Sequence, residues 1–204
     1  MAHEMTEKRS QTQAGIRTLV VGLGKTGLSC ARYLSGLGHQ VHVVDTRKNP
    51  PGLAGLKKDV PAATTTLGEI SDSQLNNVDQ LVVSPGLPMD LPLLQAARAK
   101  QIPVLSDIDL FAAVALAPVI GITGSNGKST VTSMLNDMVI EAGYRVRTGG
   151  NLGVPALDLL EAGEPDFYIL ELSSFQLERS GALPLWAATV LNLSPDHLDQ
   201  HRSY

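Results

Sequence analysis

The sequence predicts an α/β protein with two parallel β-sheets, one in each half of the chain. Short apolar segments alternate with helical segments throughout, and this alternation is typical of parallel sheets. Two glycine-rich turns, at Gly22–Gly27 and Gly121–Thr130, each follow an apolar segment and precede a helical one. Because each such turn needs a sheet edge of its own, we expect two domains, with the boundary after residue 106.

The composition is that of a globular protein that can bury a core. The chain has 204 residues, of which 43% are apolar and 18% charged, and its net charge of −4 argues against a nucleic-acid-binding protein. Cys30 is the single cysteine, which suits the reducing cytoplasm. Residues 1–15 lack the apolar segment of a signal peptide and are expected to be a disordered lead-in. No apolar stretch reaches the roughly 18 residues of a membrane span, so we expect a cytoplasmic protein without membrane insertion.

The first half opens with a nucleotide-binding pattern. An apolar strand at Thr18–Val21 leads into Gly22–Gly27, a GxGxxG turn, and then into a helix at about Thr26–Leu37. A second strand, Val41–Val44, ends at Asp45, 21 positions after the second glycine of the turn. This spacing is close to that of dinucleotide-binding folds, so NAD is one candidate ligand.

A uridine diphosphate group is the competing candidate for this site. Arg47 closely follows Asp45 and can bind a phosphate or a base, while Lys25 and Thr26 place a charge and a hydroxyl in the glycine turn. The same turn can also serve only to pack a helix against a strand, because an isolated GxGxxG is weak support for a ligand. These residues alone leave all three interpretations open.

The remainder of the first half carries signals of unequal strength. Residues 50–75 give no clear pattern. Val78–Val83 is predicted to be a strand that delivers Ser84 to the carboxyl edge of the sheet, where ligands bind in such folds. We expect a helix at Pro92–Lys100, a strand at Ile102–Leu105 and a helix at Ser106–Ala117.

The second glycine-rich turn is typical of a polyphosphate-binding loop. Its sequence, GITGSNGKST, follows a short apolar strand at Pro118–Ile120 and precedes a helix. Lys128 supplies a mobile positive charge, and Ser129 or Thr130 can place a hydroxyl on Mg²⁺. The small-GTPase pattern is not met, because Ile122 stands where that pattern has its first glycine.

Polar residues follow the predicted strands downstream of this loop. Glu171 emerges at a strand end and, with Ser129, could hold Mg²⁺ beside the phosphates of ATP. Ser173 and Gln176 either offer polar groups to a substrate or cap a helix. His197 is either a ligand of a metal or phosphate or an ordinary surface residue. We expect strands at Arg145–Arg147, Phe167–Leu170 and Ala188–Leu193, a turn at Thr148–Asn151 and a helix at Pro155–Glu161.

Taken together, these motifs resemble those of the Mur ligases. ELSSFQLE, together with GLGKTG, DTR and SPG upstream, resembles the D-glutamate-adding member of that family. The resemblance covers residues 16–204 and implies a Rossmann-like UDP-substrate-binding domain at 16–106, followed by the first part of a P-loop ATPase-type α/β domain at 107–204. The matching segments of the second half are GITGSNGKST, GGN at Gly149–Asn151, ELSSFQLE at Glu171–Glu178 and LNLSPDHLD at Leu191–Asp199.

The resemblance also implies an activity and a set of site residues. The implied enzyme is an ADP-forming ligase of peptidoglycan precursor synthesis, a monomer that uses ATP and Mg²⁺ to join D-glutamate to UDP-N-acetylmuramoyl-L-alanine through an acyl phosphate. Its catalytic residues would be Lys128, Glu171 and His197, and its metal ligands Ser129, Glu171 and His197. Residues implied to bind ATP are Gly124, Ser125, Asn126, Gly127, Lys128, Ser129 and Thr130. Residues implied to bind the UDP substrate are Lys25, Thr26, Asp45, Thr46, Arg47, Ser84, Asn151, Ser173 and Gln176.

The family chain is considerably longer than this one. The resemblance places a carbamylated lysine, the rest of the central sheet and a third domain beyond Tyr204. We therefore expect that the 204-residue chain alone has no ligase activity and that its second domain is marginally folded. The alternatives are a non-catalytic module that binds a UDP-sugar or a nucleotide, an NAD-linked oxidoreductase, and a P-loop switch protein.

Overall fold

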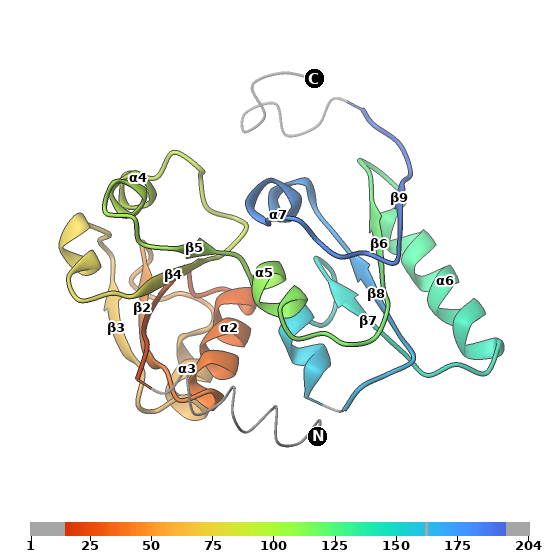
Figure 1. Cartoon of the computed structure of the whole chain (residues 1–204). Coiled ribbons are helices and arrows are strands. Elements are labelled where there is room, and N and C mark those ends of the chain that lie inside the picture. Colours follow the sequence, from red (N-terminus) through yellow and green to blue (C-terminus); the bar gives the residue numbers. More distant parts are fainter. Residues whose placement is uncertain (1–14, 162, 195–204) are drawn as a thin grey trace. The chain divides into compact units, whose positions relative to one another are not determined.

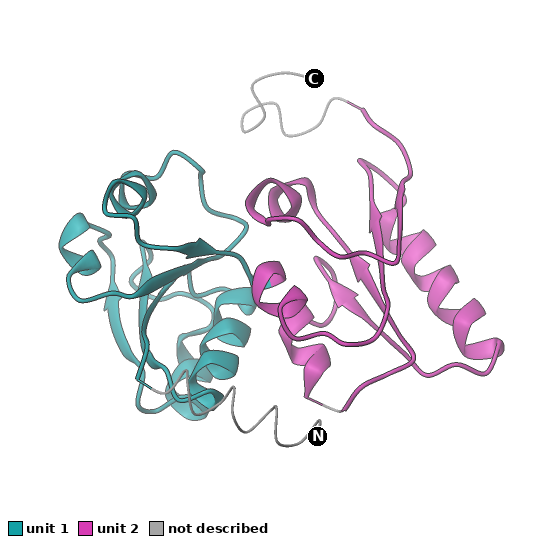
Figure 2. Cartoon of the chain, viewed as in Figure 1, with its two compact units in different colours: residues 1–107 teal, residues 108–204 magenta. Residues whose placement is uncertain are grey.

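The structure is a computed structural model, and it describes residues 15–161 and 163–194. The chain divides into two compact units, residues 1–107 and residues 108–204, shown in different colours in Figure 2. Each unit has its own parallel sheet, which confirms the predicted fold class. Among the residues described, no helix has the length and apolar character that crossing a membrane requires.

Unit 1 contains a five-stranded sheet in the order β3-β2-β1-β4-β5, with parallel pairing throughout (Figure 1). The order reverses beside β1, which is where open sheets of this kind bind ligands. The elements are β1 (Arg17–Val21), α2 (Lys25–Gly36), β2 (Gln40–Asp45), α3 (Leu53–Asp59), β3 (Thr64–Leu67), the 3₁₀ helix η1 (Asp72–Leu75), β4 (Gln80–Val83), α4 (Pro92–Ala99) and β5 (Val104–Leu105).

The central strands of unit 1 are buried on both faces, as expected of a parallel sheet covered by helices. On one face, Leu19 and Leu81 pack with Leu93 and Leu94 of α4 in a single apolar cluster. Cys30, the single cysteine, is 2% exposed in α2 and belongs to the core. This packing holds the carboxyl ends of β1, β2 and β4 in fixed positions.

Unit 2 contains a four-stranded parallel sheet in the order β7-β8-β6-β9. Tyr168 of β8 is fully buried and meets Phe111 edge-on, with ring centroids 5.0 Å apart. The elements are α5 (Asp107–Ala112), which begins at the unit boundary, β6 (Val119–Thr123), α6 (Lys128–Glu141), β7 (Val146–Gly150), the 3₁₀ helix η2 (Ala156–Leu160), β8 (Phe167–Glu171), α7 (Ser174–Arg179) and β9 (Ala187–Val190).

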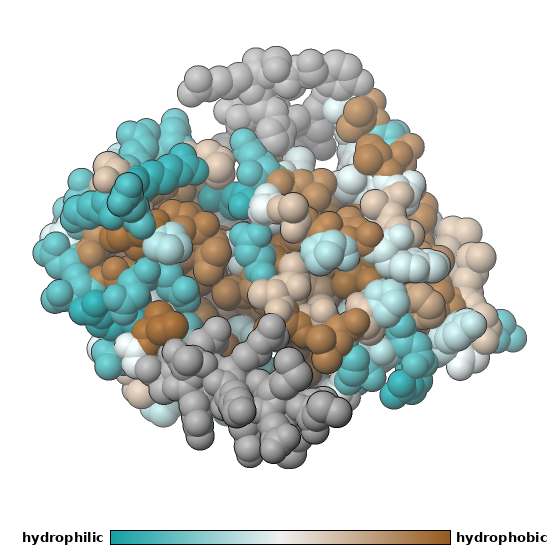
Figure 3. Space-filling model, in the orientation of Figure 1, coloured by the Kyte–Doolittle hydropathy of each residue, from teal (hydrophilic) through white to brown (hydrophobic). Residues whose placement is uncertain are grey.

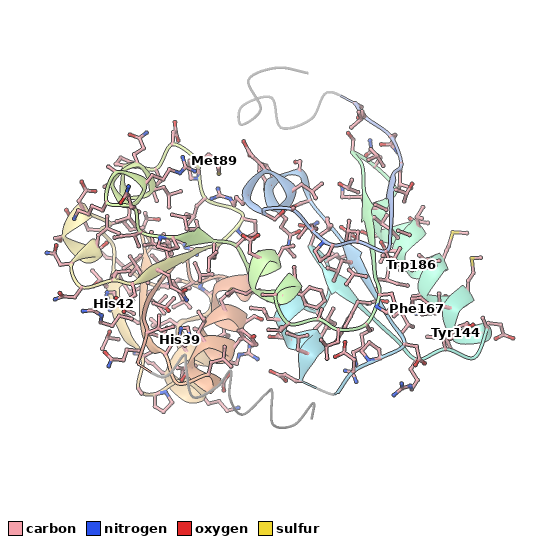
Figure 4. The ribbon with its side chains drawn as sticks, viewed as in Figure 1. His39, His42, Met89, Tyr144, Phe167 and Trp186 are labelled. Carbon is pink, nitrogen blue, oxygen red and sulfur yellow. The ribbon has the colours of Figure 1, made fainter. Side chains whose placement is uncertain are left out.

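Much of the apolar surface of unit 2 is exposed. All four residues of β9 are exposed, and Met134 and Met138 of α6 are 59% and 65% exposed. Trp186 is 67% exposed and lies in a row with Phe167 and Tyr144 (Figure 4). Apolar surface also gathers over the β9 end of the unit in Figure 3.

Most predicted elements are present, with shifted ends. Helix α5 ends at Ala112 instead of Ala117, because Glu164 accepts hydrogen bonds from the amides of Leu116 and Ala117. The predicted turn at Thr148–Asn151 is wrong, since β7 continues to Gly150 in register with Glu171. Residues 50–75, which gave no clear pattern, form α3, β3 and η1.

Three smaller differences concern unit 2. The glycine-rich loop begins at Gly124 instead of Gly121, because Thr123 still pairs with Val190 in the sheet. The helix expected at Pro155–Glu161 is the 3₁₀ helix η2. Strand β9 ends at Val190 instead of Leu193, and the residues that follow bind the glycine-rich loop.

Candidate functional site

The carboxyl edge of the unit 1 sheet is organised by Asp45. This carboxylate is 2% exposed and accepts a hydrogen bond of 2.7 Å from the amide of Leu23, inside the glycine turn. It also accepts bonds from Arg47, from the main-chain amide at 2.8 Å and from the guanidinium at 2.7 and 2.8 Å. Asp45 therefore ties the glycine turn after β1 to the end of β2.

The ion pair with Arg47 has a clear electrostatic consequence. Hydrogen bonds from the Arg47 side chain, with those from the Leu23 and Arg47 amides, outweigh the effect of burial and lower the pKa of Asp45 from 3.8 to about 2. The Arg47 side chain is 54% exposed, whereas that of Asp45 is 3% exposed. The guanidinium thus stands at the solvent side of the edge, where it can meet an anionic ligand while Asp45 holds it.

The third strand of this edge contributes Ser84, which follows β4 and donates a 3.2 Å hydrogen bond to the carbonyl of Gly22. The turn is tightly packed at Gly27, where an added Cβ would collide with that same carbonyl. The other predicted substrate residues of unit 1 lie close by in sequence: Lys25 and Thr26 open α2, and Thr46 is exposed between Asp45 and Arg47. The structure thus brings the predicted residues of unit 1 to one edge.

The edge of the unit 2 sheet carries the predicted phosphate loop. After β6 the chain turns through Gly124–Gly127 and begins α6 at Lys128. The Lys128 ammonium donates hydrogen bonds to two carbonyls of its own loop, those of Gly124 at 2.7 Å and Ser125 at 3.2 Å. The amine therefore lies over the loop, the position from which it can meet a phosphate.

Ser129 and Glu171, predicted to share a metal ion, are in direct contact. The Ser129 hydroxyl donates to Glu171 Oε2 at 2.8 Å, and the Asn151 side-chain amide donates to Oε1 at 3.0 Å. Glu171 is 3% exposed. A buried carboxylate beside a hydroxyl is the oxygen donor set that Mg²⁺ prefers, so these residues fit the ion.

The end of β7 explains how Asn151 reaches the acid. Gly150 has a φ of +106°, and a Cβ at this position would collide with the carbonyl oxygen of Glu171. The next amide, that of Asn151, donates to the same carbonyl at 2.8 Å. Asn151, predicted to touch the substrate, therefore also holds Glu171, the predicted metal ligand, in place.

Ser173 and Gln176 form a capping box at the start of α7. The Ser173 hydroxyl accepts from the amide of Gln176 at 3.2 Å, and Gln176 Oε1 accepts from the amide of Ser173 at 3.1 Å. Gln176 is 2% exposed. Ser173 and Gln176 therefore cap the helix, which was one of the two roles predicted for them. Substrate contact by the same two side chains stays a prediction.

Sequence reasoning missed Asn192. This residue lies two positions after β9 and binds Ser125 and Asn126 of the phosphate loop. The available signal was a polar side chain between Leu191 and Leu193 in a segment predicted to be a strand. His197, the other candidate in this part of the chain, lies outside the described residues.

A cavity of about 550 Å³ lies at the opposite, amino edge of the unit 1 sheet, lined by residues such as Thr18, His39, Thr64 and Asn77. Parallel α/β sheets bind ligands at their carboxyl edges instead. The glycine turn and Arg47 lie at that other edge, so we place the candidate site there by its chemistry.

These two edges define the class of protein. Residues 16–106 match the model of the N-terminal domain of MurD-like Mur ligases, and residues 122–204 match that of the Mur ligase middle domain. The chain belongs to the Mur ligase family. It is 54% identical over 197 residues to the UDP-N-acetylmuramoylalanine–D-glutamate ligase of Nitrosococcus oceani and 51% identical over 183 residues to that of Pseudomonas aeruginosa.

These alignments cover 97% and 90% of this chain but only 44% and 41% of the two relatives. The chain thus spans less than half the length of the curated relatives it matches. Among solved structures, a UDP-N-acetylmuramate:L-alanyl-γ-D-glutamyl-meso-diaminopimelate ligase from Neisseria meningitidis aligns with a TM-score of 0.60 at 20% identity, covering 92% of this chain and 63% of that one. The UDP-N-acetylmuramate–alanine ligase of Thermotoga maritima gives 0.57 at 19% identity, covering 93% and 44%. Both similarities concern the fold.

Proposed function

We propose that this chain is the substrate-binding and ATP-binding part of a ligase that adds D-glutamate to UDP-N-acetylmuramoyl-L-alanine, in the cytoplasm, using ATP and Mg²⁺. The observation that carries the proposal is the contact of 2.8 Å between Ser129 and the buried Glu171, at the start of the helix that follows the phosphate loop. Relatives that are 54% and 51% identical are UDP-N-acetylmuramoylalanine–D-glutamate ligases, which supports the same substrates.

The chemistry requires activation of a carboxylate, because an unmodified carboxylate has a poor leaving group. In the proposed reaction an oxygen of the L-alanine carboxylate attacks the γ-phosphorus of ATP, and ADP leaves. The D-glutamate amine then attacks the acyl carbon, and inorganic phosphate leaves as the amide forms. Neither step needs a protein nucleophile, so the residues act by positioning the reactants and neutralising charge.

The residues of unit 2 would divide this work. The backbone amides at the start of α6 and the Lys128 ammonium bind the phosphates, and Lys128 exchanges its two carbonyl contacts for phosphate oxygens. Ser129 and Glu171 would hold Mg²⁺, which neutralises charge on the phosphates when bound. Asn151 keeps the Glu171 carboxylate oriented. A role for His197 at a second metal ion stays part of the proposal.

The edge of unit 1 would hold the UDP group of the substrate. Arg47 supports this assignment over NAD, because Asp45 is occupied by the Leu23 amide and the guanidinium, whereas a dinucleotide fold uses this acid to bind a ribose. The exposed guanidinium and Lys25 suit a diphosphate. Thr26, Thr46 and Ser84 would add hydroxyl contacts.

Calorimetry on the chain tests this assignment. We expect saturable binding of UDP-N-acetylmuramoyl-L-alanine and of ATP with Mg²⁺, with little ADP release when D-glutamate is added, because the chain spans less than half of its relatives. NADH serves as the control ligand. Tight NADH binding without binding of the UDP substrate would overturn the proposal in favour of an oxidoreductase.

A further inference from the structure

The phosphate loop of unit 2 is hydrogen-bonded to the segment after β9, chiefly through the main chain and the side chain of Asn192. The main-chain carbonyl of Asn192 accepts the amide of Ser125 at 3.0 Å, and its Oδ1 accepts the amide of Asn126 at 2.9 Å. Its Nδ2 donates to the carbonyl of Asn126 at 2.9 Å. Asn192 thus makes three hydrogen bonds with two consecutive loop residues, an arrangement we call the Asn192 clamp.

A second contact beside the clamp strengthens it. The Ser125 hydroxyl donates to the carbonyl of Ser194 at 3.1 Å and lies 2.9 Å from the Ser194 amide, which donates to it. The clamp also continues the sheet, because the β6–β9 pairing ends at Thr123 and Val190 and the amide of Leu191 then donates to the carbonyl of Thr123 at 2.9 Å. The loop therefore begins as an extension of the strand pairing, made by main-chain bonds up to Ser125 and by the Asn192 side chain at Asn126.

The clamp determines which loop amides remain for a ligand. The amides of Ser125 and Asn126 are both donated to Asn192. The amides of Gly127–Thr130 lie at the start of the 14-residue helix α6, where an α-helix leaves its first N–H groups without an intrahelical acceptor. Such a helix start attracts anions.

We propose that Asn192 is a positioning residue for nucleotide binding: it fixes the first half of the phosphate loop, so that the phosphates are bound by the amides of Gly127–Thr130 and not by those of Ser125 and Asn126. This inference rests on the proposed function, since it presupposes that the loop binds a nucleotide. An amide side chain suits the task, because it supplies one acceptor and one donor to the main chain of Asn126.

The first test uses the unmodified chain and nuclear magnetic resonance of its backbone amides. Without nucleotide, the amides of Ser125 and Asn126 should exchange slowly with solvent. Addition of ADP and Mg²⁺ should shift the amide resonances of Gly127–Thr130 strongly and those of Ser125 and Asn126 weakly. Fast exchange of the Ser125 and Asn126 amides in the nucleotide-free chain would by itself overturn the proposal.

The second test compares Asn192→Ala, Asn192→Asp and the control Ser194→Ala. Asn192→Ala should weaken ADP binding about tenfold, because the loop must then be ordered on binding. Asn192→Asp keeps the acceptor but loses the donor and adds a negative charge near the phosphates, so it should also weaken ADP binding. Ser194→Ala should bind ADP normally, because Ser194 contacts Ser125 through main-chain atoms.

Two readouts separate positioning from general damage to the fold. Affinity for UDP-N-acetylmuramoyl-L-alanine, measured by calorimetry, should be unchanged in all three variants, and the Asn126 amide should exchange faster in Asn192→Ala. Wild-type affinity for ADP in Asn192→Ala would overturn the inference while leaving the proposed function intact. Absence of ADP and ATP binding by the wild-type chain would overturn the proposed function itself, together with this inference.

Discussion

Single side chains fix the geometry of both candidate sites by binding the main chain of a glycine-rich turn. Asp45 binds the amide of Leu23 in unit 1, and Asn192 binds Ser125 and Asn126 in unit 2. Glu171 is held differently, by the side chains of Ser129 and Asn151. The hydrogen bonds of the buried carboxylates Asp45 and Glu171 are costly to remove because the buried partner is left unsatisfied, whereas those of Asn192 are exposed to solvent.

Lys128 and Arg47 should separate the two ligands. In the proposed ligase, Lys128→Ala should lower ATP-dependent turnover about 100-fold or more, because a charge aimed at the phosphates is lost. It should leave the affinity for the UDP substrate within about twofold.

Arg47→Ala should instead weaken binding of the UDP substrate about tenfold, as expected for a charged hydrogen bond. Calorimetry with each ligand and an assay of ADP release check both; equal effects on both ligands would contradict a two-site division.

The Asp45 carboxylate should make unit 1 less stable in acid. Its pKa is lowered to about 2 in the folded chain, from 3.8, so its stabilising effect is complete above the unfolded value and is lost as the pH falls through the folded one. Allowing for screening at the exposed Arg47, the effect is on the order of 1–2 kcal/mol. Asp45→Asn should therefore lower the melting temperature at pH 7, and its difference from wild type should shrink between pH 4 and pH 2. A difference independent of pH would rule out the ion pair as its cause.

At the scale of secondary structure, the positions of the strand ends were harder to predict than the existence of the strands and helices. Apolar strands such as β4, predicted at Val78–Val83 and observed at Gln80–Val83, and the helix after the phosphate loop could be predicted, because periodicity and glycine spacing are local properties. The continuation of β7 through Gly149 and Gly150 could not, because it depends on pairing with Leu170 and Glu171, about 20 residues away in sequence. The same limitation hid Asn192, whose partners lie 66 residues earlier in the sequence.

The site edges illustrate the same division. Lys128, Ser129 and Glu171 could be selected as candidate phosphate and metal ligands from the sequence alone. The structure places Ser129 and Glu171 in contact. The sequence could not distinguish a capping role of Ser173 and Gln176 from substrate contact, because both use the same hydroxyl and amide groups. Residues 50–75 gave no pattern because β3 is short and none of its residues is buried.

Gly150→Ala should disturb unit 2 more than an ordinary glycine substitution. A Cβ at Gly150 would collide with the carbonyl of Glu171, and the φ of +106° is already unfavourable for alanine. We expect destabilisation of roughly 2–4 kcal/mol. Gly143→Ala is the matched control, since its φ is +86° but no atom lies within 4 Å of the added Cβ; it should cost about 1 kcal/mol. Thermal unfolding followed by circular dichroism compares the two variants. Equal losses of stability would show that the Glu171 carbonyl moves away from the added Cβ at little cost, contrary to this prediction.

At the scale of the whole molecule, the two units differ in how completely their sheets are covered. The central strands of unit 1 are buried, whereas β9 of unit 2 is exposed along its length and the neighbouring side chains Met134 and Met138 are more than half exposed. Less apolar burial means less hydrophobic stabilisation. The comparison supports the expectation that the second domain is marginally stable, which stays a prediction.

Urea unfolding of the chain should therefore show two transitions. Trp186 is the single tryptophan and belongs to unit 2, so its fluorescence reports on that unit alone, while circular dichroism reports on both. The fluorescence transition should occur at lower urea than the later part of the dichroism change. ADP with Mg²⁺ should move the fluorescence transition to higher urea and leave the other in place. One coincident transition for both signals would contradict independent units.

The position of β9 has a consequence for control of the nucleotide site. Within the described part of the chain, β9 pairs with β6 only, at the border of the sheet, and the Asn192 clamp follows it directly. The phosphate loop is therefore hydrogen-bonded to the segment that follows β9, the strand of unit 2 whose described residues are all exposed. Under the proposed function, we expect a displacement of β9 to change the affinity for nucleotide through Asn192, without any contact between β9 and the nucleotide itself.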